Sequence, residues 1–578
     1  MATTGYDAII VGGGHNGLVC AAYLARAGLR PLVLEARGIV GGASVTQEPW
    51  PGYRISTLAY VSSLLLPRIV RELELERHGY HVWEMSPDYF VPFPDGRHIM
   101  IWADTGKSAA EIRRFSERDA LAYPRFDDFL SRMAMLIRPL LETTPPAVGS
   151  RKPGDLVDQV RFAARFAGLG ARGVGELVKL MTQSTADLLD DWFESDDVKT
   201  ALCSQGAIGA YGGPYMPGTA YVLLHHWMGE INGHLGAWGV VRGGMGAISE
   251  AIASNAREHG AEIRVDARVA RVLTEDGPGG PAAIGVVLET GEEIRAPIIA
   301  SSAHPQITFL RLLDRSVLPG DFVGAIERIR SRSGTVKINL GIGELPDFTA
   351  LPGTTVGPQH SGSIELCHSM AYLERAYDDA KEGRPSARPY SEMVIPTVYD
   401  RSIAPGGKHV VSLFSQYVPG SWAAEDHRVE LEAFADRVID ELTLLAPNFR
   451  GSIEHREVIG PYEMEHEYGL IGGSIQQGDL TLDQMLSWRP VAGYANYRTP
   501  VRQLYLCGSG AHPGGGVMGA PGMNAAREIV ADLQGGAAGT VRRGTARVGA
   551  GVARGVRVGI RAASRVASEV RQRRGDAP

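Results

Sequence analysis

Three glycines and one acidic residue near the N-terminus have the types and spacing needed to hold phosphate and ribose. Gly12, Gly14 and Gly17 fit the pattern G-x-G-x-x-G, and Glu35 follows 18 residues after Gly17. Glycines at these positions allow a tight turn, let a pyrophosphate approach the backbone, and let a helix pack closely on a strand. The Glu35 carboxylate could accept hydrogen bonds from ribose hydroxyls. The spacing therefore predicts a dinucleotide site.

The elements around these residues are the ones that such a site requires. Residues 6–11 form an apolar run rich in β-branched side chains, which predicts a buried strand. Residues 18–27 have helical character and stop at Gly28, and residues 31–34 predict a second strand that ends at Glu35. The helix N-terminus would offer unpaired N–H groups and a partial positive charge to the phosphates. Because the chain has 72 glycines, this order of elements is far more specific than the glycines alone.

A second pair of glycines, Gly41 and Gly42, favours FAD over NAD. A further tight turn just after the acidic residue is typical of FAD enzymes, in which the chain continues under the dinucleotide. An NAD-only dehydrogenase is the weaker alternative. The residues predicted to contact the cofactor are Gly12, Gly14, His15, Asn16, Gly17, Glu35, Ala36, Arg37, Gly41, Gly42, Arg242, Gly244, Val269, Gly508, Gly516, Val517 and Met518.

The C-terminal part of the chain contains another glycine-rich turn. Residues 503–510 predict a strand and turn, and residues 522–533 a helix. Gly514, Gly516 and Gly519 also fit G-x-G-x-x-G, but too little chain follows to build a second β-α-β unit. We expect instead a closely approaching backbone whose helix N-terminus faces the flavin ring, where its positive end would stabilise the anionic reduced flavin.

Three histidines are the candidates for catalysis. His512 precedes the C-terminal glycine turn and could donate a proton or polarise a substrate, because its ordinary pKa lies near neutrality. The alternative is that it only hydrogen-bonds the turn. His225 and His226 would point to opposite faces if their segment were a strand, so a metal site is not expected there and either one could contact substrate.

Composition and charge place the chain among ordinary soluble proteins. Hydrophobic residues make up 44% and charged residues 21%. The four cysteines are scattered without a C-x-x-C, which argues against a zinc site or a redox disulfide and for buried or spare thiols. No signal peptide and no apolar run of about 18 residues is evident, so a cytoplasmic protein is expected.

The C-terminal tail, residues 536–578, is strongly basic. Ten arginines against Glu569 and Asp576 give the tail a charge of +8. Because the net charge of the whole chain is −7, the rest of the chain carries −15. We expect a solvated, flexible tail. A weak peripheral contact with anionic lipid is the alternative, and no motif supports nucleic-acid binding.

The dinucleotide motif, residues 242–246 and the segment 505–520 together resemble a known family. They are similar to the phytoene-desaturase-like FAD oxidoreductases of the amine oxidase superfamily, and within them to the branch called pyridine nucleotide-disulfide oxidoreductase domain-containing protein 2. The phrases that carry the resemblance also include residues 14–19, 221–226 and 302–310. The likeness spans about residues 5–533, and the basic tail has no counterpart in it.

The resemblance implies an α/β fold: a glutathione-reductase-like, Rossmann-type FAD-binding domain with an interleaved substrate domain of mixed sheet and helices. We expect the FAD-binding domain in three parts, a helical cap, a substrate domain and the tail. Their boundaries are 1–107, 236–319 and 496–535 for the FAD-binding domain, 108–235 for the helical substrate and cap region, 320–495 for the substrate domain, and 536–578 for the tail.

The function expected from these features is transfer of hydride equivalents between a fairly apolar organic substrate and flavin N5 by dehydrogenation, desaturation or a related isomerisation. One alternative is an amine oxidase-like oxidase, although the paired aromatic residues usual beside the flavin are not evident in the sequence. Another is a flavoprotein with a mainly regulatory, partner-binding role. The sequence names neither the substrate nor the electron acceptor.

Overall fold

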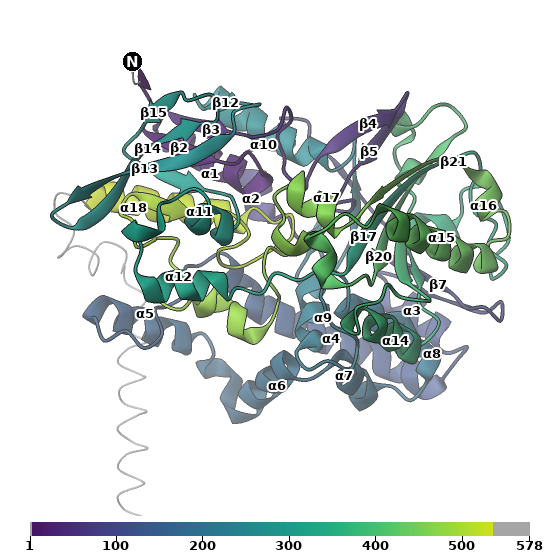
Figure 1. Cartoon of the computed structure of the whole chain (residues 1–578). Helices are drawn as coiled ribbons and strands as arrows, with labels where there is room; N and C mark the ends of the chain where they lie inside the picture. Colours follow the sequence, from purple (N-terminus) through teal and green to yellow (C-terminus); the bar gives the residue numbers. More distant parts are fainter. Residues whose placement is uncertain (1–2, 536–578) are drawn as a thin grey trace, which may run out of the picture. The chain divides into compact units, whose positions relative to one another are not determined.

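The N-terminal strand, helix and strand lie where the sequence predicts them. The computed structural model describes residues 3–535, and in it strand β2 (Ala8–Val11) leads through Gly12 into helix α1 (His15–Arg26) and strand β3 (Pro31–Leu34). These strands belong to a parallel five-stranded sheet of order β12-β3-β2-β16-β22 (Figure 1). The other three strands are β12 (Glu262–Arg264), β16 (Ile299–Ser301) and β22 (Leu504–Leu506). The α/β prediction, with the sheet assembled from distant segments, is confirmed.

Helices and a smaller sheet complete the part of the molecule around this sheet. Helix α10 (Gly246–Glu258) packs on α1, and the first turn of α18 (Ala520–Gly535) approaches α1 so closely that a Cβ on Gly522 would lie 2.1 Å from the Asn16 carbonyl oxygen. A four-stranded sheet of order β1-β15-β14-β13 consists of β1 (Thr3–Thr4), β15 (Glu293–Arg295), β14 (Gly280–Leu288) and β13 (Val269–Gly277).

A seven-stranded sheet forms the centre of the substrate domain. Its order is β21-β17-β20-β19-β18-β7-β8, and every neighbouring pair is antiparallel except β18 with β7. The strands are β21 (Ile453–Ile459), β17 (Thr335–Ile342), β20 (His409–Gln416), β19 (Tyr390–Val394), β18 (Ser363–Leu366), β7 (Tyr89–Pro92) and β8 (His98–Ile101).

The predicted domain boundary at residue 107 needs correction. Strands β7 and β8 were assigned with residues 1–107 to the FAD-binding domain, but they extend the substrate sheet instead. The physical reason is the parallel pairing of β7 with β18, about 270 residues later in the chain, which a local pattern does not reveal. The hairpin that joins β7 to β8 is itself local and ordinary.

The two faces of the seven-stranded sheet differ sharply in character. Side chains such as Val336, Ile338 and Leu340 lie on one face and pack against helix α15 (Arg428–Leu445) in an apolar core. The alternate residues of the same strands lie on the other face, which is buried beneath helices and carries charged side chains, among them Lys337. Both faces are therefore covered by other parts of the protein, but only one is apolar.

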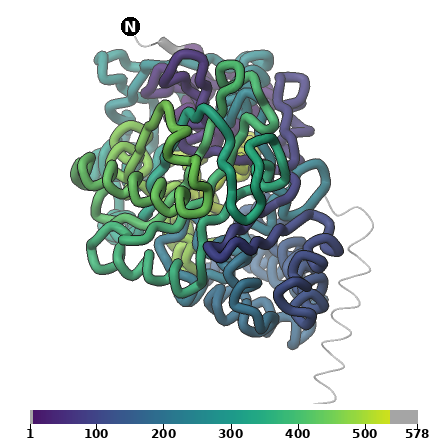
Figure 2. Tube along the Cα trace, turned by 90° about the vertical axis from the view of Figure 1, so that its right-hand side faces the viewer, coloured from purple at the N-terminus to yellow at the C-terminus, as the bar shows by residue number. Residues whose placement is uncertain are grey.

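A layer of helices covers the polar face of the sheet. Figures 1 and 2 both show helices from the blue part of the chain gathered below the green strands. They are α3 (Thr105–Ile112), α4 (Glu117–Leu141), α6 (Gly170–Thr182), α7 (Thr185–Trp192), α8 (Asp196–Cys203), α9 (Thr219–Trp227) and, from later in the chain, α14 (Met370–Lys381). Helix α5 (Pro153–Ala164) comes from the same stretch, but it has no buried residue and lies apart from the sheet in Figure 1. The helical character predicted for residues 108–235 agrees with this layer. Between residues 3 and 535, no helix is both long and apolar enough to cross a bilayer.

Shorter elements connect these layers. They are β4 (Thr46–Trp50), β5 (Tyr53–Ser56), α2 (Pro67–Glu72), β6 (Val82–Glu84), β9 (Glu230–Ile231), β10 (His234–Leu235), β11 (Gly239–Val241), α11 (Pro305–Leu310), α12 (Gly320–Glu327), α13 (Pro358–Ser361), α16 (Phe449–Ser452) and α17 (Pro461–His466). The predicted basic tail lies outside the described residues.

All four cysteines are buried free thiols, as the sequence indicates. Cys203 and Cys367 are neighbours in the core, with their sulfur atoms 3.9 Å apart. The hydrogen bond with the Cys367 thiol, and then burial, raise the pKa of Cys203, so it stays protonated.

We expect Gly17→Ala to lower the free energy of unfolding by about 1–3 kcal/mol, because the new Cβ would lie 2.2 Å from the Gly12 carbonyl oxygen. Gly175 in α6 is the matched control, since a Cβ there meets nothing within 4 Å. Gly175→Ala should be neutral or stabilising by up to about 1 kcal/mol. Urea unfolding followed by circular dichroism compares them. Equal midpoints would refute the close packing of α1.

Candidate functional site

One cavity of about 660 Å³ joins the parallel sheet to the polar face of the seven-stranded sheet. It begins at the carboxyl ends of β2 and β3, where ligands bind in open α/β sheets, and extends to the helical layer. Thirteen of the residues singled out from the sequence line it: Gly12, Gly14, His15, Asn16, Glu35, Ala36, Arg37, Gly41, Gly42, His226, Val269, Gly516 and Val517. Residues from four distant segments thus meet around one space.

Glu35 holds the two glycine turns in place. Its carboxylate accepts hydrogen bonds from the Gly13 N–H at 2.7 Å and from the Arg37 N–H at 2.9 Å. The Gly41 N–H donates to the Gly13 carbonyl at 2.8 Å, and both Gly41 and Gly42 have positive φ angles, which glycine adopts without strain. The predicted contact of Glu35 with a ribose stays a prediction, but its position at the cavity wall suits that role.

The N-terminus of α1 presents polar atoms that have no partner within the protein. The His15 Nε2 and Asn16 Oδ1 atoms are buried, and neither has a hydrogen-bond partner among the described residues. The Asn16 Nδ2 donates to the Ser509 Oγ at 2.9 Å, which ties α1 to the C-terminal segment. Since buried polar atoms are normally paired, and since a helix N-terminus attracts anions, these residues fit the pyrophosphate of a dinucleotide.

Some predicted cofactor residues act by close packing and do not line the cavity. A Cβ on Gly508 would lie 2.2 Å from the Ser302 carbonyl oxygen, so this glycine lets β22 and β16 meet. Gly17 serves the contact of α1 with β2, and Gly244 fits against Thr46. Met518 is fully buried outside the cavity lining.

The prediction that the Arg242 side chain contacts the cofactor does not agree with the structure. Its side chain is exposed and does not line the cavity, while its backbone N–H donates to the His81 carbonyl. The prediction relied on a glycine-rich segment next to a cation, a local pattern that does not reveal the direction of the side chain.

The structure separates the three candidate catalytic histidines. His512 does not reach the cavity lining: its Nε2 lies 2.9 Å from the Leu140 carbonyl of α4, so it performs a structural role. His225 and His226 lie on helix α9, not on a strand. His226 lines the cavity and its Nδ1 bonds the Gln205 carbonyl at 2.8 Å, whereas His225 is buried outside the lining.

Burial keeps the histidines of this region uncharged. Burial lowers the pKa of His226 to about 4 and that of His15 to about 4. Burial, helped by the positive charges of Arg489 and Arg311, lowers the pKa of His304 to about 3. At neutral pH these three imidazoles are neutral, so each is a weak proton acceptor.

Sequence reasoning missed the residues that wall the far end of the cavity. Tyr60 and Phe414 both line it and stack with their ring centroids 5.8 Å apart. Ile208 and Trp238 complete this largely apolar end. The four residues come from four separate segments, and no local spacing connects them. The structure therefore does contain a stacked aromatic pair at the cavity, a feature that the sequence did not reveal.

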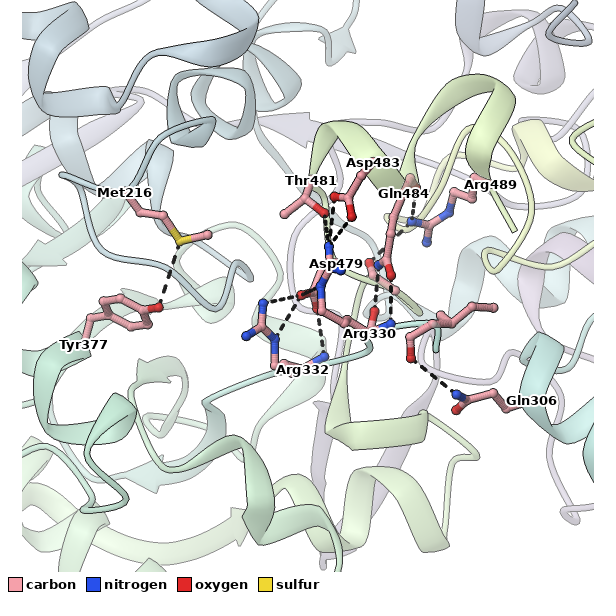
Figure 3. A network of polar contacts seen from close by, with 12 residues as sticks. Met216, Gln306, Arg330, Arg332, Tyr377, Asp479, Thr481, Asp483, Gln484 and Arg489 are labelled. Carbon is pink, nitrogen blue, oxygen red and sulfur yellow. Dashed lines mark hydrogen bonds and ion pairs between the residues drawn. The ribbon is translucent and has the colours of Figure 1, made fainter. Parts of the chain in front are cut away.

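The remaining wall of the cavity contains Ile475 and Gln476. Three arginines hold the loop that follows these residues, and Figure 3 shows them: Arg330, Arg332 and Arg489. The buried Arg489 side chain donates to the carbonyls of Gln476 at 2.6 Å, of Gln477 at 3.0 Å and of Ser509 at 2.9 Å. Nearby, Asp479 accepts from Arg332 at 2.6 Å and lies 3.6 Å from Arg330. Burial lowers the pKa of Arg489 only to about 10, so it stays charged and holds the loop against the cofactor segment.

Together the parallel sheet, the paired glycine turns and the cavity define a dinucleotide-binding protein of the flavoprotein class. The chain belongs to the family described as flavin containing amine oxidoreductase, whose model matches residues 17–530. FAD is therefore its cofactor, and the chain is an FAD-dependent oxidoreductase.

Individual relatives agree with this assignment. The chain is 41% identical to rat pyridine nucleotide-disulfide oxidoreductase domain-containing protein 2, over 92% of this chain and 94% of the relative. It is 25% identical to a limonene dehydrogenase subunit of Castellaniella defragrans (91% and 95% covered) and 23% identical to a lycopene-forming phytoene desaturase of Paracoccus (89% and 95%). The predicted resemblance is confirmed.

A solved structure supports the fold alone. The oxidoreductase from Methanosarcina mazei superimposes with a TM-score of 0.56 at 14% identity, over 90% of this chain and 99% of that chain.

We expect Glu35→Ala to weaken FAD retention by about 1–3 kcal/mol, roughly tenfold or more in Kd, because the N–H groups of Gly13 and Arg37 lose their acceptor. Fluorescence titration of the apoprotein with FAD measures this. Glu293→Ala, which removes an exposed carboxylate on β15, is the control and should bind FAD like the wild type. Unchanged affinity in Glu35→Ala would exclude Glu35 from cofactor binding.

Proposed function

We propose that the protein acts on a fairly apolar organic substrate by dehydrogenation, desaturation or a related isomerisation. The observation that carries this proposal is the character of the far end of the cavity, where Tyr60, Phe414, Trp238 and Ile208 supply mainly apolar surface and His226 is neutral. An uncharged, hydrophobic substrate would lose little hydration there.

The names of two relatives support the same substrate class. A limonene dehydrogenase subunit and a phytoene desaturase are named for hydrocarbon substrates. Both relatives are distant, so they suggest a class and not a particular molecule.

Different residues of this chain would bind the cofactor and orient the substrate. The Gly12–Gly17 turn and the N-terminus of α1 bind the pyrophosphate, Glu35 contacts the ribose, and the backbone at Gly516 and Val517 approaches the ring system. When bound, the flavin supplies an acceptor for a hydride equivalent at N5. The aromatic and aliphatic walls orient the substrate and exclude water, which protects the reaction from competing paths.

An amine oxidase-like reaction is the second candidate, favoured by one observation. The stacked Tyr60–Phe414 pair is an aromatic wall of the kind that amine oxidases place beside the flavin. A flavoprotein with a mainly regulatory role is the remaining alternative. Anaerobic bleaching of the flavin by different compounds separates these three functions.

We expect anaerobic incubation of the FAD-loaded protein with apolar polyenes or terpenes to bleach the flavin absorbance. Primary amines, apolar alcohols, NADH and NADPH are tested in parallel. Bleaching by amines alone would replace the proposed reaction with an amine oxidation, and bleaching by NADPH alone would make the protein a reductase that passes electrons onward. A flavin that no compound bleaches would refute a substrate-oxidising role.

We expect Ile208→Trp to slow this bleaching at least about tenfold while leaving the flavin content unchanged, since the larger side chain fills the apolar end of the cavity and not the dinucleotide end. Val157→Trp, on the exposed side of α5, is the matched control and should not change the rate. A normal rate in Ile208→Trp would show that substrate binds elsewhere.

A further inference from the structure

A row of charged residues crosses the polar face of the seven-stranded sheet directly behind the cavity. Lys337 of β17 and Glu392 of β19 are both paired with Phe414 of β20, and Glu365 of β18 is paired with Glu392. Cross-strand partners project from the same face of a sheet. The order across the sheet is therefore Lys337, Phe414, Glu392 and Glu365, with all four side chains beneath the helical layer.

The two carboxyl groups, which we call the acid pair, are buried without a nearby neutralising ion pair. Glu392 and Glu365 are each 1% exposed. Glu365 accepts hydrogen bonds from the Tyr390 hydroxyl at 2.7 Å and the Ser363 hydroxyl at 3.2 Å. Neither carboxylate oxygen of Glu392 has a partner at hydrogen-bond distance among residues 3–535. An ionised carboxylate in such surroundings is strongly disfavoured.

Lys337 is the cation of the row, and it is also fully buried. Its ammonium group donates to the Asn339 side chain at 2.8 Å and to the Ser412 hydroxyl. Asn339 in turn donates to Glu457 at 2.9 Å. The positive charge is thus two strands away from Glu392, close enough to interact with it and too far to form an ion pair.

Tyr60 connects this row to the cavity. Its ring stacks on Phe414, and the Lys337 ammonium lies 4.9 Å from the ring centroid. Tyr60 and Phe414 are the two residues of this group that line the cavity, while the acid pair lies beside Phe414 on the same face of the sheet and outside the lining. Charge on the acid pair and charge in the cavity are separated by little more than one aromatic layer.

The groups of the row titrate far from their ordinary ranges. Burial, and then the charge of Glu365, raise the pKa of Glu392 to about 8, against smaller lowering effects of Ser363, Tyr60 and Lys337. Burial raises the pKa of Glu365 to about 7, against hydrogen bonds from Tyr390 and from nearby serines.

Burial also favours the uncharged forms of the ionisable groups around the acid pair. Burial lowers the pKa of Lys337 to about 7, although Glu457 and Glu392 oppose this. The hydroxyls of Tyr60, Tyr89 and Tyr390 and the thiol of Cys203 also face the acid pair, and burial holds the first three neutral. The carboxyl groups and Lys337 are therefore the members of this cluster that can change charge near neutral pH.

We propose that the acid pair of Glu365 and Glu392, with Lys337 as its counter-charge, is a proton store for the redox reaction in the cavity. Around neutral pH one member of the pair keeps its proton, because ionisation of one buried carboxyl disfavours ionisation of its neighbour. When the site is reduced, the pair takes up a second proton. Tyr60 separates the pair from the substrate, so these acids act through it and do not touch the reacting atoms.

During turnover the acid pair would receive the proton that substrate oxidation releases, a role that rests on the proposed function. Two C–H bonds of the substrate break and a C=C bond forms, so the substrate is oxidised by two electrons. One hydrogen leaves with its electron pair as the hydride equivalent that reduces FAD, and the other leaves as a proton. The ionised member of the acid pair receives that proton. The neutral histidines of the cavity, with pKa values of about 3 to 4, are far weaker acceptors.

The first experiment counts protons without any substrate. The FAD-loaded protein is reduced electrochemically near pH 7 with methyl viologen, which carries electrons without protons, and a pH indicator reports proton uptake per flavin. Because the negative charge of the reduced flavin raises the pKa of nearby acids, the wild type should take up more protons than Glu392→Gln or Glu365→Gln, by up to about one per flavin.

Asp88→Asn is the matched control. Asp88 is also a buried carboxyl, and burial raises its pKa to about 7, but it does not belong to the row or to the cavity lining. Its variant should take up as many protons as the wild type. Equal uptake by the wild type and both Gln variants would overturn the proposal, as would a loss of uptake in Asp88→Asn as large as theirs.

Infrared spectroscopy of the FAD-free protein tests the same pair directly. The carbonyl band of a protonated carboxyl should disappear as the pH rises through about 7 to 8 in the wild type. Glu392→Gln removes the neighbouring charge, so Glu365 should ionise at lower pH. Lys337→Met removes the counter-charge, so the band should persist to higher pH. Identical titrations in all three proteins would refute a coupled pair, even if one variant fails to retain FAD.

The two proposals fail in different ways. If no organic compound bleaches the flavin while the difference in proton uptake persists, the proposed function falls and the proton store stands. If terpenes or polyenes bleach the flavin and the Gln variants take up protons like the wild type, the reverse holds.

Discussion

The close meeting of three parallel strand ends is the constraint on which the rest of the structure depends. Strands β2, β16 and β22 run in register, so their carboxyl ends at Val11, Ser301 and Leu506 lie side by side. The next residue or two of each strand must turn in very little space: a Cβ on Gly508 would lie 2.2 Å from the Ser302 carbonyl. Because the backbones approach so closely, the N-terminus of α1 and the turn at Gly516 reach the same cavity from opposite ends of the sequence.

The seven-stranded sheet imposes the second constraint through its alternation of side chains. On one face, aliphatic residues pack against α15. Aliphatic residues on the other face would stabilise the fold equally well. Replacing buried charges by well-packed apolar residues is often neutral or stabilising, so Lys337, Glu365 and Glu392 are not needed to hold the sheet together. Their position on either side of Phe414, next to Tyr60, suits the role in the chemistry of the cavity that we propose for them.

The sequence predicts the local parts of this site well. The spacing of Gly12, Gly14 and Gly17, and the strand that ends at Glu35, follow from backbone geometry that a few consecutive residues decide. The direction of an isolated side chain does not follow in this way, which is why the sequence places Arg242 at the cofactor although its side chain is exposed, and why it leaves both roles of His512 open. Tyr60 and Phe414 become neighbours only through long-range sheet pairing, and the parallel contact of β7 with β18 moves two strands out of the domain to which their position in the chain assigned them.

Burial has opposite effects on the two kinds of ionisable group near the cavity. It removes the charge of His226 and His304, whose pKa values fall well below neutrality, and it brings the carboxyl groups of Glu365 and Glu392 up to neutrality. Arg489 keeps its charge, but backbone carbonyls surround it and fix it within the wall. A reaction that releases a proton into this space therefore meets histidines that are poor bases and, one aromatic layer away, a carboxylate that is ready to accept it. The same desolvation that makes the cavity suitable for an apolar substrate thus determines which residues can respond to a change of charge.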